Sequence, residues 1–405
     1  MTWHRLWNRR TFLQRLGYLS GLGVVGSHTA WSFAKVQPLV RDMHPMRGET
    51  EPLFAYVGSW DHGIQVFAVE DRRWRLTQTI ASNQPSALAL HPTRRFIYAV
   101  NEIHEYQNLP TSTVEAYGID AHDGHLVLLN RQPLSLSAVA PRYLAVSPDG
   151  SSLVVAVHGG GAYNVLPIRT DGSLESVSGI MKEVGSGPDQ EHQKAAHPQM
   201  LLFDTTQRHL LSADLGSDRL NVFTLAENQL IAMHRSTTIP GRGPRSLALH
   251  PSGRMLYVMN ELNASISCFG YDAASGQILD QLQHQPLQTG AFSKNAGTTA
   301  MAMHSSGNFL YTSCAHSGAG SSANSRIMAW RMDAATGKLN LIQELDSWMN
   351  SSYVENMIPS HNTLFVLSQA EGIFRLNLDP MNGLLDHAVP VAKVSAPKSM
   401  VLQYL

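Results

Sequence analysis

Two short apolar runs joined by a turn recur along most of this chain. The first run alternates small and larger apolar residues, as in Ser86–Leu90, and the second is rich in β-branched and aromatic residues, as in Phe96–Val100. Both compositions favour β-strands. Glycine at the turns Pro148–Gly150 and Pro251–Gly253 supplies the positive φ that closes a hairpin. Two more strand-like runs follow each hairpin, so the pattern predicts four strands per repeat and no helical periodicity.

The repeats lie about 50 residues apart, a spacing typical of β-propeller blades. Copies start at Pro85, Pro141, Pro198 and Pro244, with weaker copies near Thr298 and Ser352. A half copy, PKSMVLQYL, ends the chain and supplies only an innermost strand, Met400–Tyr404. Three runs from Leu53, Gly63 and Trp74 supply its partners, which leaves no open sheet edge at the seam. We therefore predict an all-β, seven-bladed β-propeller of four-stranded antiparallel blades, with one blade shared between the two ends.

The N-terminal segment differs from the repeats. Asn8–Gln14 (NRRTFLQ) resembles a twin-arginine export signal, a weakly apolar stretch follows at Leu16–Val25, and Ser32–Ala34 fits a small-x-small cleavage site. We expect residues 1–34 to be a signal peptide, 35–51 a linker and 52–405 the propeller. The protein would then use the twin-arginine export machinery and reside in the periplasm. A short membrane anchor is the alternative, but the interrupted apolar run is shorter than the ~20 residues of a span, so we expect no stable membrane insertion.

Composition and charge argue against a nucleic-acid partner. The chain has 405 residues, of which 43% are hydrophobic and 15% charged. Removing residues 1–34 leaves 26 basic against 31 acidic residues, a net charge of −5, so no nucleic-acid partner is implied. No metal or cofactor motif occurs, and we expect a monomer that binds a small molecule. Cys268 and Cys314 carry no pairing signal, and we expect two buried thiols, with a disulfide as the alternative.

Four phrases are more specific than a generic blade. They are Val157–Leu174, Gly185–Gln199, Ser212–Phe223 and Gly241–Phe269, which contains Gly-Pro-Arg and Asn-Glu-Leu-Asn. Together they resemble the lactonase family of seven-bladed propellers, which includes a bacterial 6-phosphogluconolactonase and fungal carboxy-muconate cycloisomerases. The resemblance extends over essentially all of residues 52–405. It implies a hydrolase that opens a sugar-acid lactone.

In a propeller, the starts of the innermost strands and the ends of the second strands converge near the axis on one face and form a natural pocket. The predicted innermost-strand starts are Ser86, Arg142, Gln199, Arg245, Thr299, Tyr353 and Lys398. The predicted second-strand ends are Glu102, His158, Asp214, Glu261 and the segment 314–316. Two or three cations around one axis suit a carboxylate or phosphate substrate.

The family site implied by the resemblance contains an Arg, a Glu, a His and a second Arg. The first Arg and the Glu fall on Arg245 and Glu261, whereas the His falls on Gln199 and the second Arg on Ala315. Gln199 cannot transfer a proton, so a nearby imidazole would have to restore that function. We expect the catalytic residues to be Glu261 as the base, Arg245 as the oxyanion or carboxylate clamp, and His197. The expected substrate-binding residues are Gln199, Arg142, His158, His316, Glu102 and Lys398.

Other interpretations stay open. A propeller that has lost the chemistry and binds a ligand or protein is one alternative, since folds host many functions. A muconate-type cycloisomerase is another, against which the replaced His and Arg count. Arg245 and Glu261 could be only a structural ion pair within one blade. We expect His91 and His250 to be turn residues that cap backbone groups, and Asp214 to order its blade through backbone hydrogen bonds.

Overall fold

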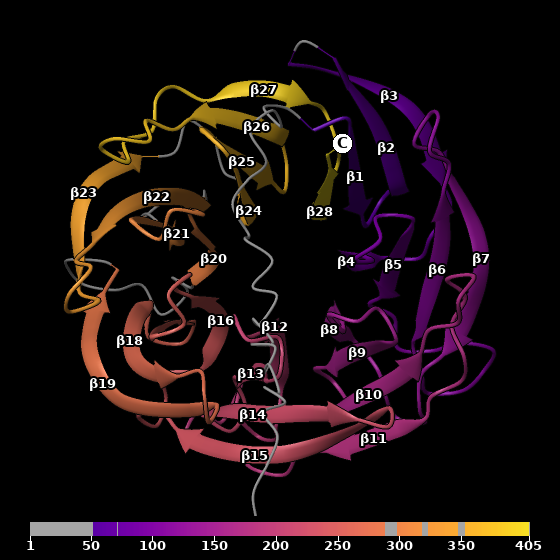
Figure 1. Cartoon of the computed structure of the whole chain (residues 1–405), viewed down its shortest axis with the longest axis horizontal. Helices are drawn as coiled ribbons and strands as arrows, with labels where there is room; N and C mark the ends of the chain where they lie inside the picture. Colours follow the sequence, from indigo (N-terminus) through magenta and orange to yellow (C-terminus); the bar gives the residue numbers. More distant parts are fainter. Residues whose placement is uncertain (1–51, 71, 288–297, 318–322, 347–352, 405) are drawn as a thin grey trace, which may run out of the picture. The chain divides into compact units, whose positions relative to one another are not determined.

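The computed structural model describes residues 52–70, 72–287, 298–317, 323–346 and 353–404. These residues form seven four-stranded sheets, each antiparallel, around a central axis (Figure 1). Innermost strands of neighbouring sheets contact one another in the order β28, β4, β8, β12, β16, β20 and β24, and β24 returns to β28. The predicted seven-bladed propeller is therefore confirmed. The signal-peptide and linker predictions fall on residues 1–51, which lie outside the described residues.

The two inner strands of each blade carry the repeated phrase. The innermost strands are β28 (Pro397–Gln403), β4 (Pro85–Leu90), β8 (Pro141–Val146), β12 (Pro198–Phe203), β16 (Pro244–Leu249), β20 (Thr298–Met303) and β24 (Val354–Ser360). The second strands are β1 (Phe54–Ser59), β5 (Phe96–Asn101), β9 (Ser152–Val157), β13 (Leu210–Asp214), β17 (Met255–Asn260), β21 (Phe309–Ser317) and β25 (Thr363–Ser368). Strands β5, β9 and β17 are buried at every position, which explains their continuous apolar composition.

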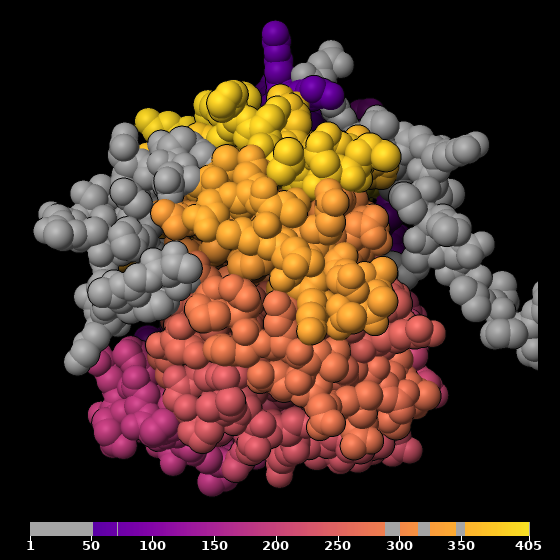
Figure 2. Space-filling model, turned by 90° about the vertical axis from the view of Figure 1, so that its left-hand side faces the viewer, coloured from indigo at the N-terminus to yellow at the C-terminus, as the bar shows by residue number. Residues whose placement is uncertain are grey.

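The two outer strands complete each blade. The third strands are β2 (Gly63–Glu70), β6 (Thr113–Ile119), β10 (Ala162–Pro167), β14 (Arg219–Ala226), β18 (Ser265–Asp272), β22 (Ala323–Met332) and β26 (Gly372–Asn377). The outermost strands are β3 (Arg73–Ile80), β7 (Leu126–Pro133), β11 (Gly179–Lys182), β15 (Gln229–Thr237), β19 (Gln277–Pro286), β23 (Leu339–Asp346) and β27 (Val389–Ala392). Seen from the side, the blades follow one another in chain order, from salmon to yellow (Figure 2).

The seventh blade combines both ends of the described chain. Strand β28 pairs with β1 in a sheet of order β28-β1-β2-β3, as predicted. The Tyr56 hydroxyl on β1 donates a hydrogen bond to Oε1 of Gln403 on β28 at 2.7 Å. Yellow and indigo strands consequently lie side by side in Figure 1. We call the face where the innermost strands begin the mouth face, and the face where they turn into the second strands the turn face.

Histidines at the turn face link neighbouring blades. In the turns that follow β4 and β20, Nδ1 of His91 and His304 bonds a hydroxyl two residues later, Thr93 or Ser306, at 2.8 Å. The opposite nitrogen, Nε2, reaches a backbone carbonyl in the next blade's turn, at Gly150 and His361 respectively. His250 repeats the first bond with Ser252 at 2.7 Å. The prediction that His91 and His250 are turn residues is confirmed, and the bonds of His91 and His304 also join blades.

Tyrosines of the second strands form another link across the seams. Each donates its hydroxyl to the carbonyl of a turn glycine between the third and fourth strands of the next blade. The pairs are Tyr98–Gly172 (3.1 Å), Tyr257–Gly337 (2.7 Å) and Tyr311–Gly383 (3.0 Å). The glycines have positive φ and lie directly against Phe96, Met255 and Phe309, so a Cβ would overlap these side chains.

Amide side chains of outermost strands form a third link. Each donates to and accepts from the backbone of one leucine in the next blade, as a neighbouring strand would. The pairs are Gln78 with Leu126, Asn130 with Leu174, Gln283 with Leu339 and Gln343 with Leu385. These bonds pair backbone groups at the rim that would otherwise depend on water.

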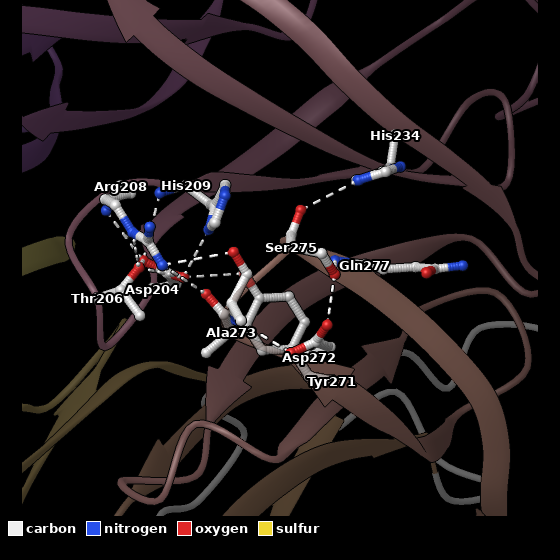
Figure 3. A network of polar contacts seen from close by, with 11 residues as sticks. Asp204, Thr206, Arg208, His209, His234, Tyr271, Asp272, Ala273, Ser275 and Gln277 are labelled. Atoms are coloured by element: carbon white, nitrogen blue, oxygen red, sulfur yellow. Dashed lines mark hydrogen bonds and ion pairs between the residues drawn. The ribbon is translucent and has the colours of Figure 1, made fainter. Parts of the chain in front are cut away.

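At the seam between the blades β12–β15 and β16–β19, polar side chains take the place of the aromatic contact (Figure 3). His209 stands where Phe96 stands in its blade, and its ring lies against Gly276 of the next blade. Asp204 accepts from Nδ1 of His209 at 2.9 Å and from the Tyr271 hydroxyl across the seam at 3.1 Å. These hydrogen bonds outweigh burial, and the pKa of Asp204 lies below its usual value. A buried carboxylate is stable here because it is fully partnered.

Cys268 and Cys314 are both buried and do not form a disulfide, as the preferred prediction had it. Burial raises the pKa of the Cys268 thiol to about 11. Within the described ranges, no helix has the length and hydrophobicity needed to cross a membrane.

Candidate functional site

A break in strand register places one residue of each blade at the mouth of the axis. In each innermost strand the pairing with the second strand skips the second residue, which projects from the ladder as a bulge. The skipped residues are Lys398, Ser86, Arg142, Gln199, Arg245, Thr299 and Glu355. Six of the seven predicted innermost-strand starts therefore occupy the expected register position.

The seventh prediction, Tyr353, is wrong by two residues. Strand β24 begins at Val354, and the skipped residue is Glu355. In the blades that begin with proline, that residue marks the strand start, and β24 has none there. Tyr353 lies before the strand and is 37% exposed. The correction replaces an aromatic ring at the mouth with a carboxylate.

Three ion pairs surround the mouth. Arg142 pairs with Glu102 of the preceding blade at 3.0 Å, and Arg245 pairs with Glu261 of its own blade at 3.0 Å. Lys398 pairs with Glu355 of the preceding blade at 2.8 Å. Lys398 also lies over the Trp60 ring, 4.3 Å from its centroid. The mouth therefore presents three fixed cations, each held by one carboxylate.

The three pairs differ in burial. Glu102 is 8% exposed, and burial raises its pKa even though Arg142 and Lys398 oppose the shift. Arg245 and Glu261 retain 29% and 30% side-chain exposure. The Glu261 carboxylate raises the pKa of Arg245, and burial opposes this effect. The Arg245–Glu261 pair is thus the one in which both partners keep substantial access to solvent and to a ligand.

A cavity of about 350 Å³ follows the axis below this ring of charges. Glu102, Arg142, Gln199, Arg245, Glu355 and Lys398 line its upper part. Apolar side chains such as Met301, Ile358 and Val401 line the remainder. A volume of this size suits a small ligand, and the charges suit an anionic group. Glu261 does not line the cavity and reaches it through Arg245.

Gln199 connects this cavity to two stacked histidines. Its side-chain nitrogen donates to Nδ1 of His158 at 2.8 Å, so the proton of a neutral His158 ring must be on Nε2. Burial, and secondarily nearby positive charge, lowers the pKa of His158 to about 3. The His158 and His197 rings stack with centroids 4.5 Å apart. Nδ1 of His197 donates to the carbonyl oxygen of His158 at 2.9 Å, which leaves Nε2 of a neutral His197 as an acceptor.

Asp214 fixes the backbone beside these rings. One carboxylate oxygen accepts hydrogen bonds from the backbone nitrogens of His197, Gly216 and Ser217 at 2.7–3.2 Å. Its other oxygen is buried without a hydrogen-bond partner among the described residues, and burial raises the pKa of Asp214. The predicted role of Asp214 in ordering its blade through backbone bonds agrees with this geometry.

The structure brings most of the candidate residues together. Glu102, Arg142, Gln199, Arg245 and Lys398 line one cavity, and Glu261 and His158 bond to members of that set. His197 lies behind Gln199, stacked on His158. Ala315 and His316 lie in β21, but their side chains fall outside the described part of the structure.

Two residues at the mouth were missed from the sequence. Glu355 was hidden by the register error, and its negative charge within an innermost-strand start was the available signal. Trp60 follows the second strand β1, the position that Glu102 and Glu261 occupy in their blades, and this equivalence could have identified it. Among the described residues, no group of three or more His, Cys, Asp or Glu side chains is placed to hold a metal ion.

Comparison with known proteins places these features in a family. Residues 54–402 match the family described as lactonase, 7-bladed beta-propeller. A 6-phosphogluconolactonase of Bacillus subtilis is 26% identical over 263 residues, which cover 63% of this chain and 73% of the relative. A probable 6-phosphogluconolactonase of Arthroderma benhamiae is 24% identical over 342 residues, covering 81% and 83%.

Solved structures share the fold. A putative 6-phosphogluconolactonase from Bacteroides fragilis superposes with a TM-score of 0.77 at 24% identity, covering 89% of this chain and 99% of that one. The periplasmic gluconolactonase of Pseudomonas aeruginosa superposes with a TM-score of 0.73 at 23% identity, covering 86% and 98%.

Proposed function

Because this chain belongs to the lactonase family of seven-bladed β-propellers, we propose that it hydrolyses a sugar-acid lactone at the axial mouth. The observation that carries the proposal is the Arg245–Glu261 pair, which stands partly exposed beside a cavity lined by cations. Relatives named 6-phosphogluconolactonase support the reaction class.

The proposed division of labour follows the chemistry of lactone opening. Glu261 takes a proton from water, and the water oxygen attacks the lactone carbonyl carbon. Arg245 stabilises the negative charge that develops on the carbonyl oxygen. The ring C–O bond then breaks, and the ring oxygen receives the proton held by Glu261. One lactone and one water give one hydroxy acid, so the step balances without a cofactor.

The other cations bind the substrate in this proposal. Arg142 and Lys398 are held in place by Glu102 and Glu355 and attract an anionic or strongly polar group of the lactone. Gln199 contacts the substrate from the cavity wall, and His158 behind it fixes the orientation of the amide. His197, whose Nε2 has no assigned partner, is the second candidate for proton transfer.

The decisive experiment compares three carboxylates that each hold one cation. Full-length protein and the variants Glu261→Gln, Glu102→Gln and Glu355→Gln are assayed for hydrolysis of glucono-δ-lactone and of its 6-phosphate. Loss of a general base reduces kcat/KM by about 10²–10⁴-fold, and we expect this loss for Glu261→Gln only. We expect Glu102→Gln and Glu355→Gln to change kcat/KM by about tenfold or less.

Two outcomes would replace the proposal. An inactive wild type that is nevertheless stabilised against heat by gluconate would favour a binding propeller without chemistry. A larger loss for Glu102→Gln than for Glu261→Gln would transfer the base to Glu102. The two lactones distinguish a phosphorylated from an unphosphorylated substrate.

We also propose that the enzyme acts in the periplasm on unphosphorylated lactones. The support is the twin-arginine-like phrase Asn8–Gln14 and the structural similarity to a periplasmic gluconolactonase. Replacing both arginines, Arg9 and Arg10, by lysine should retain the protein in the cytoplasm, which cell fractionation would detect. The monomeric state likewise stays a prediction, which light scattering would test.

A further inference from the structure

The seam between the blade β24–β27 and the shared blade lacks the packing device found at other seams. In three other blades, the first residue of the second strand (β5, β17 or β21) is Phe or Met, and the third is a tyrosine that bonds a turn glycine of the next blade. Strand β25 has Thr363 and Phe365 at these positions, so both the large first side chain and the hydroxyl are absent. The facing turn, between β2 and β3, is only two residues long and contains Arg72 instead of glycine.

A second seam with a short turn shows how such a gap can be closed. The blade β12–β15 has the turn Glu227–Asn228, and the positive φ of Asn228 (58°) is similar to that of Arg72 (62°). There, the Ser152 hydroxyl donates to the Asn228 side chain at 2.6 Å and seals the seam. Strand β9 begins with Ser152, as β25 begins with Thr363. The shared-blade seam likewise combines a short turn with a small hydroxyl residue at the start of the second strand, but its other side chains differ.

At the shared-blade seam these side chains surround a cavity of about 400 Å³ at the turn face. Trp74 and Phe365 form an aromatic wall, with ring centroids 5.3 Å apart. Arg72, Arg375 and His361 also line the cavity, whereas no Asp or Glu among the described residues does so. The cavity therefore combines positive charge with a flat apolar surface, in a chain whose mature form is expected to be negative overall.

Arg375 is the informative residue of this cavity. It lies opposite Phe365 in the β25–β26 register, so both side chains emerge on the same face. Its Nε is buried without a hydrogen-bond partner, and its guanidinium makes no ion pair within the described residues. Burying part of an unpartnered guanidinium is unfavourable unless an anion compensates it.

We propose that this cavity is a second ligand site, separate from the axial mouth, which binds a small aromatic carboxylate. The guanidinium of Arg375 receives the carboxylate as a planar fork. The ring of the ligand packs on Trp74 and Phe365. The volume is within the range of small-molecule sites. The site lies at a blade seam on the turn face, whereas Glu261 lies on the mouth face, so the site does not depend on the proposed hydrolase activity.

Titration calorimetry of the full-length protein tests the site with three probes: benzoate, benzyl alcohol and inorganic phosphate. We expect benzoate to bind with a stoichiometry of one and at least about tenfold more tightly than either other probe. Arg375→Gln and Trp74→Ala should each weaken benzoate binding by about tenfold or more. Arg245→Gln, which alters the axial mouth, should leave benzoate binding unchanged. Circular dichroism and the thermal midpoint confirm that each variant is folded.

Several results would overturn the site. These are the absence of benzoate binding at millimolar concentration, equal binding of benzyl alcohol, tighter binding of phosphate than of benzoate, and loss of binding in Arg245→Gln but not in Arg375→Gln. If Arg375→Gln does not fold, Trp74→Ala and the probe comparison still decide. Lactone hydrolysis by Arg375→Gln should equal that of the wild type, so failure of this proposal and failure of the proposed function are distinguishable.

Discussion

At the mouth face, the residue at the bulge of the innermost strand changes from blade to blade among Lys, Ser, Arg, Gln, Thr and Glu. At the turn face, three of the seven blades repeat a His–hydroxyl pair, and the second strands of three send a tyrosine to a glycine in the next blade. The mouth-face residues differ in side chain although they occupy the same backbone position in every blade, and the charged ones remain partly exposed. The turn-face set repeats the same contacts from blade to blade, and its three tyrosines are fully buried. The comparison separates residues that form the candidate ligand site from residues that hold the blades together.

The largest effect should come from a mouth residue, and it should be an effect on activity. Replacing Arg245 by Gln removes the proposed oxyanion donor while retaining hydrogen-bonding capacity. We expect kcat/KM for the lactone to fall by about 10²–10³-fold, the usual loss for one such donor. The free energy of unfolding should change by about 1 kcal/mol or less, because the Arg245–Glu261 pair is partly exposed. A collapse of stability in urea titration would instead make the pair structural.

The next effect should be on stability and should leave activity intact. Replacing Gly383 by Ala puts a Cβ into the Phe309 ring at a residue with φ +78°. Steric overlap and left-handed backbone strain together should lower the free energy of unfolding by about 3 kcal/mol, measured in urea. Gly118→Ala is the matched control, because its Cβ would meet nothing closer than the Leu129 side chain at 3.5 Å. Equal stability losses in both variants would show that the turn contact is not responsible.

A third test uses the pH dependence of stability. The pKa of His158 is about 3 in the folded protein and near 6.5 when unfolded, so only the unfolded state gains this proton between those values. Stability from His158 is complete above pH 6.5 and is lost as pH falls toward 3. The contribution is about 1.4 kcal/mol per pH unit for one proton. His158→Asn keeps an acceptor for Gln199 and should remove this slope; an unchanged slope would contradict the burial of a neutral His158.

The smallest effect should come from a single seam bond. Tyr257→Phe removes the hydroxyl that donates to the Gly337 carbonyl at 2.7 Å. We expect a loss of about 1 kcal/mol in the free energy of unfolding and unchanged lactone kinetics. Tyr98→Phe breaks the equivalent bond to Gly172 and should behave alike. A change in kcat/KM in either variant would mean that the two faces are energetically coupled.

The sequence predicted the positions of the mouth residues better than their partners. A proline marks the strand start before Arg142, Gln199, Arg245 and Lys398, so counting one residue onward placed each at the bulge. Glu355 was missed because β24 begins with Val354, so no proline marks the start of this strand. Ion-pair partners such as Glu355 and Lys398 lie in different blades. The side-chain conformations that bring them within 2.8 Å depend on how the blades pack, which the spacing of residues in the sequence does not reveal.

The histidines illustrate the same limit. His158 and His197 were identified as candidates, but nothing in the spacing indicates that their rings stack or that Gln199 determines the tautomer of His158. The turn-face cavity was not predicted either. Its signal is a comparison between repeats, Thr363 and Phe365 where other blades have a larger residue and a tyrosine, and this became meaningful only when the facing turn was known.

The shared seventh blade has a consequence for how the protein folds. The bond between Tyr56 and Gln403 joins residues 347 positions apart, and the whole β1–β28 pairing has similar separations. Contacts this distant in sequence form slowly, because a long loop must be ordered before they contribute. Strand β28 also follows every other described strand of the propeller in the chain. The six blades made before it must therefore wait with an exposed edge on β1, and that interval is when a nascent chain would be most exposed to aggregation or most in need of a chaperone.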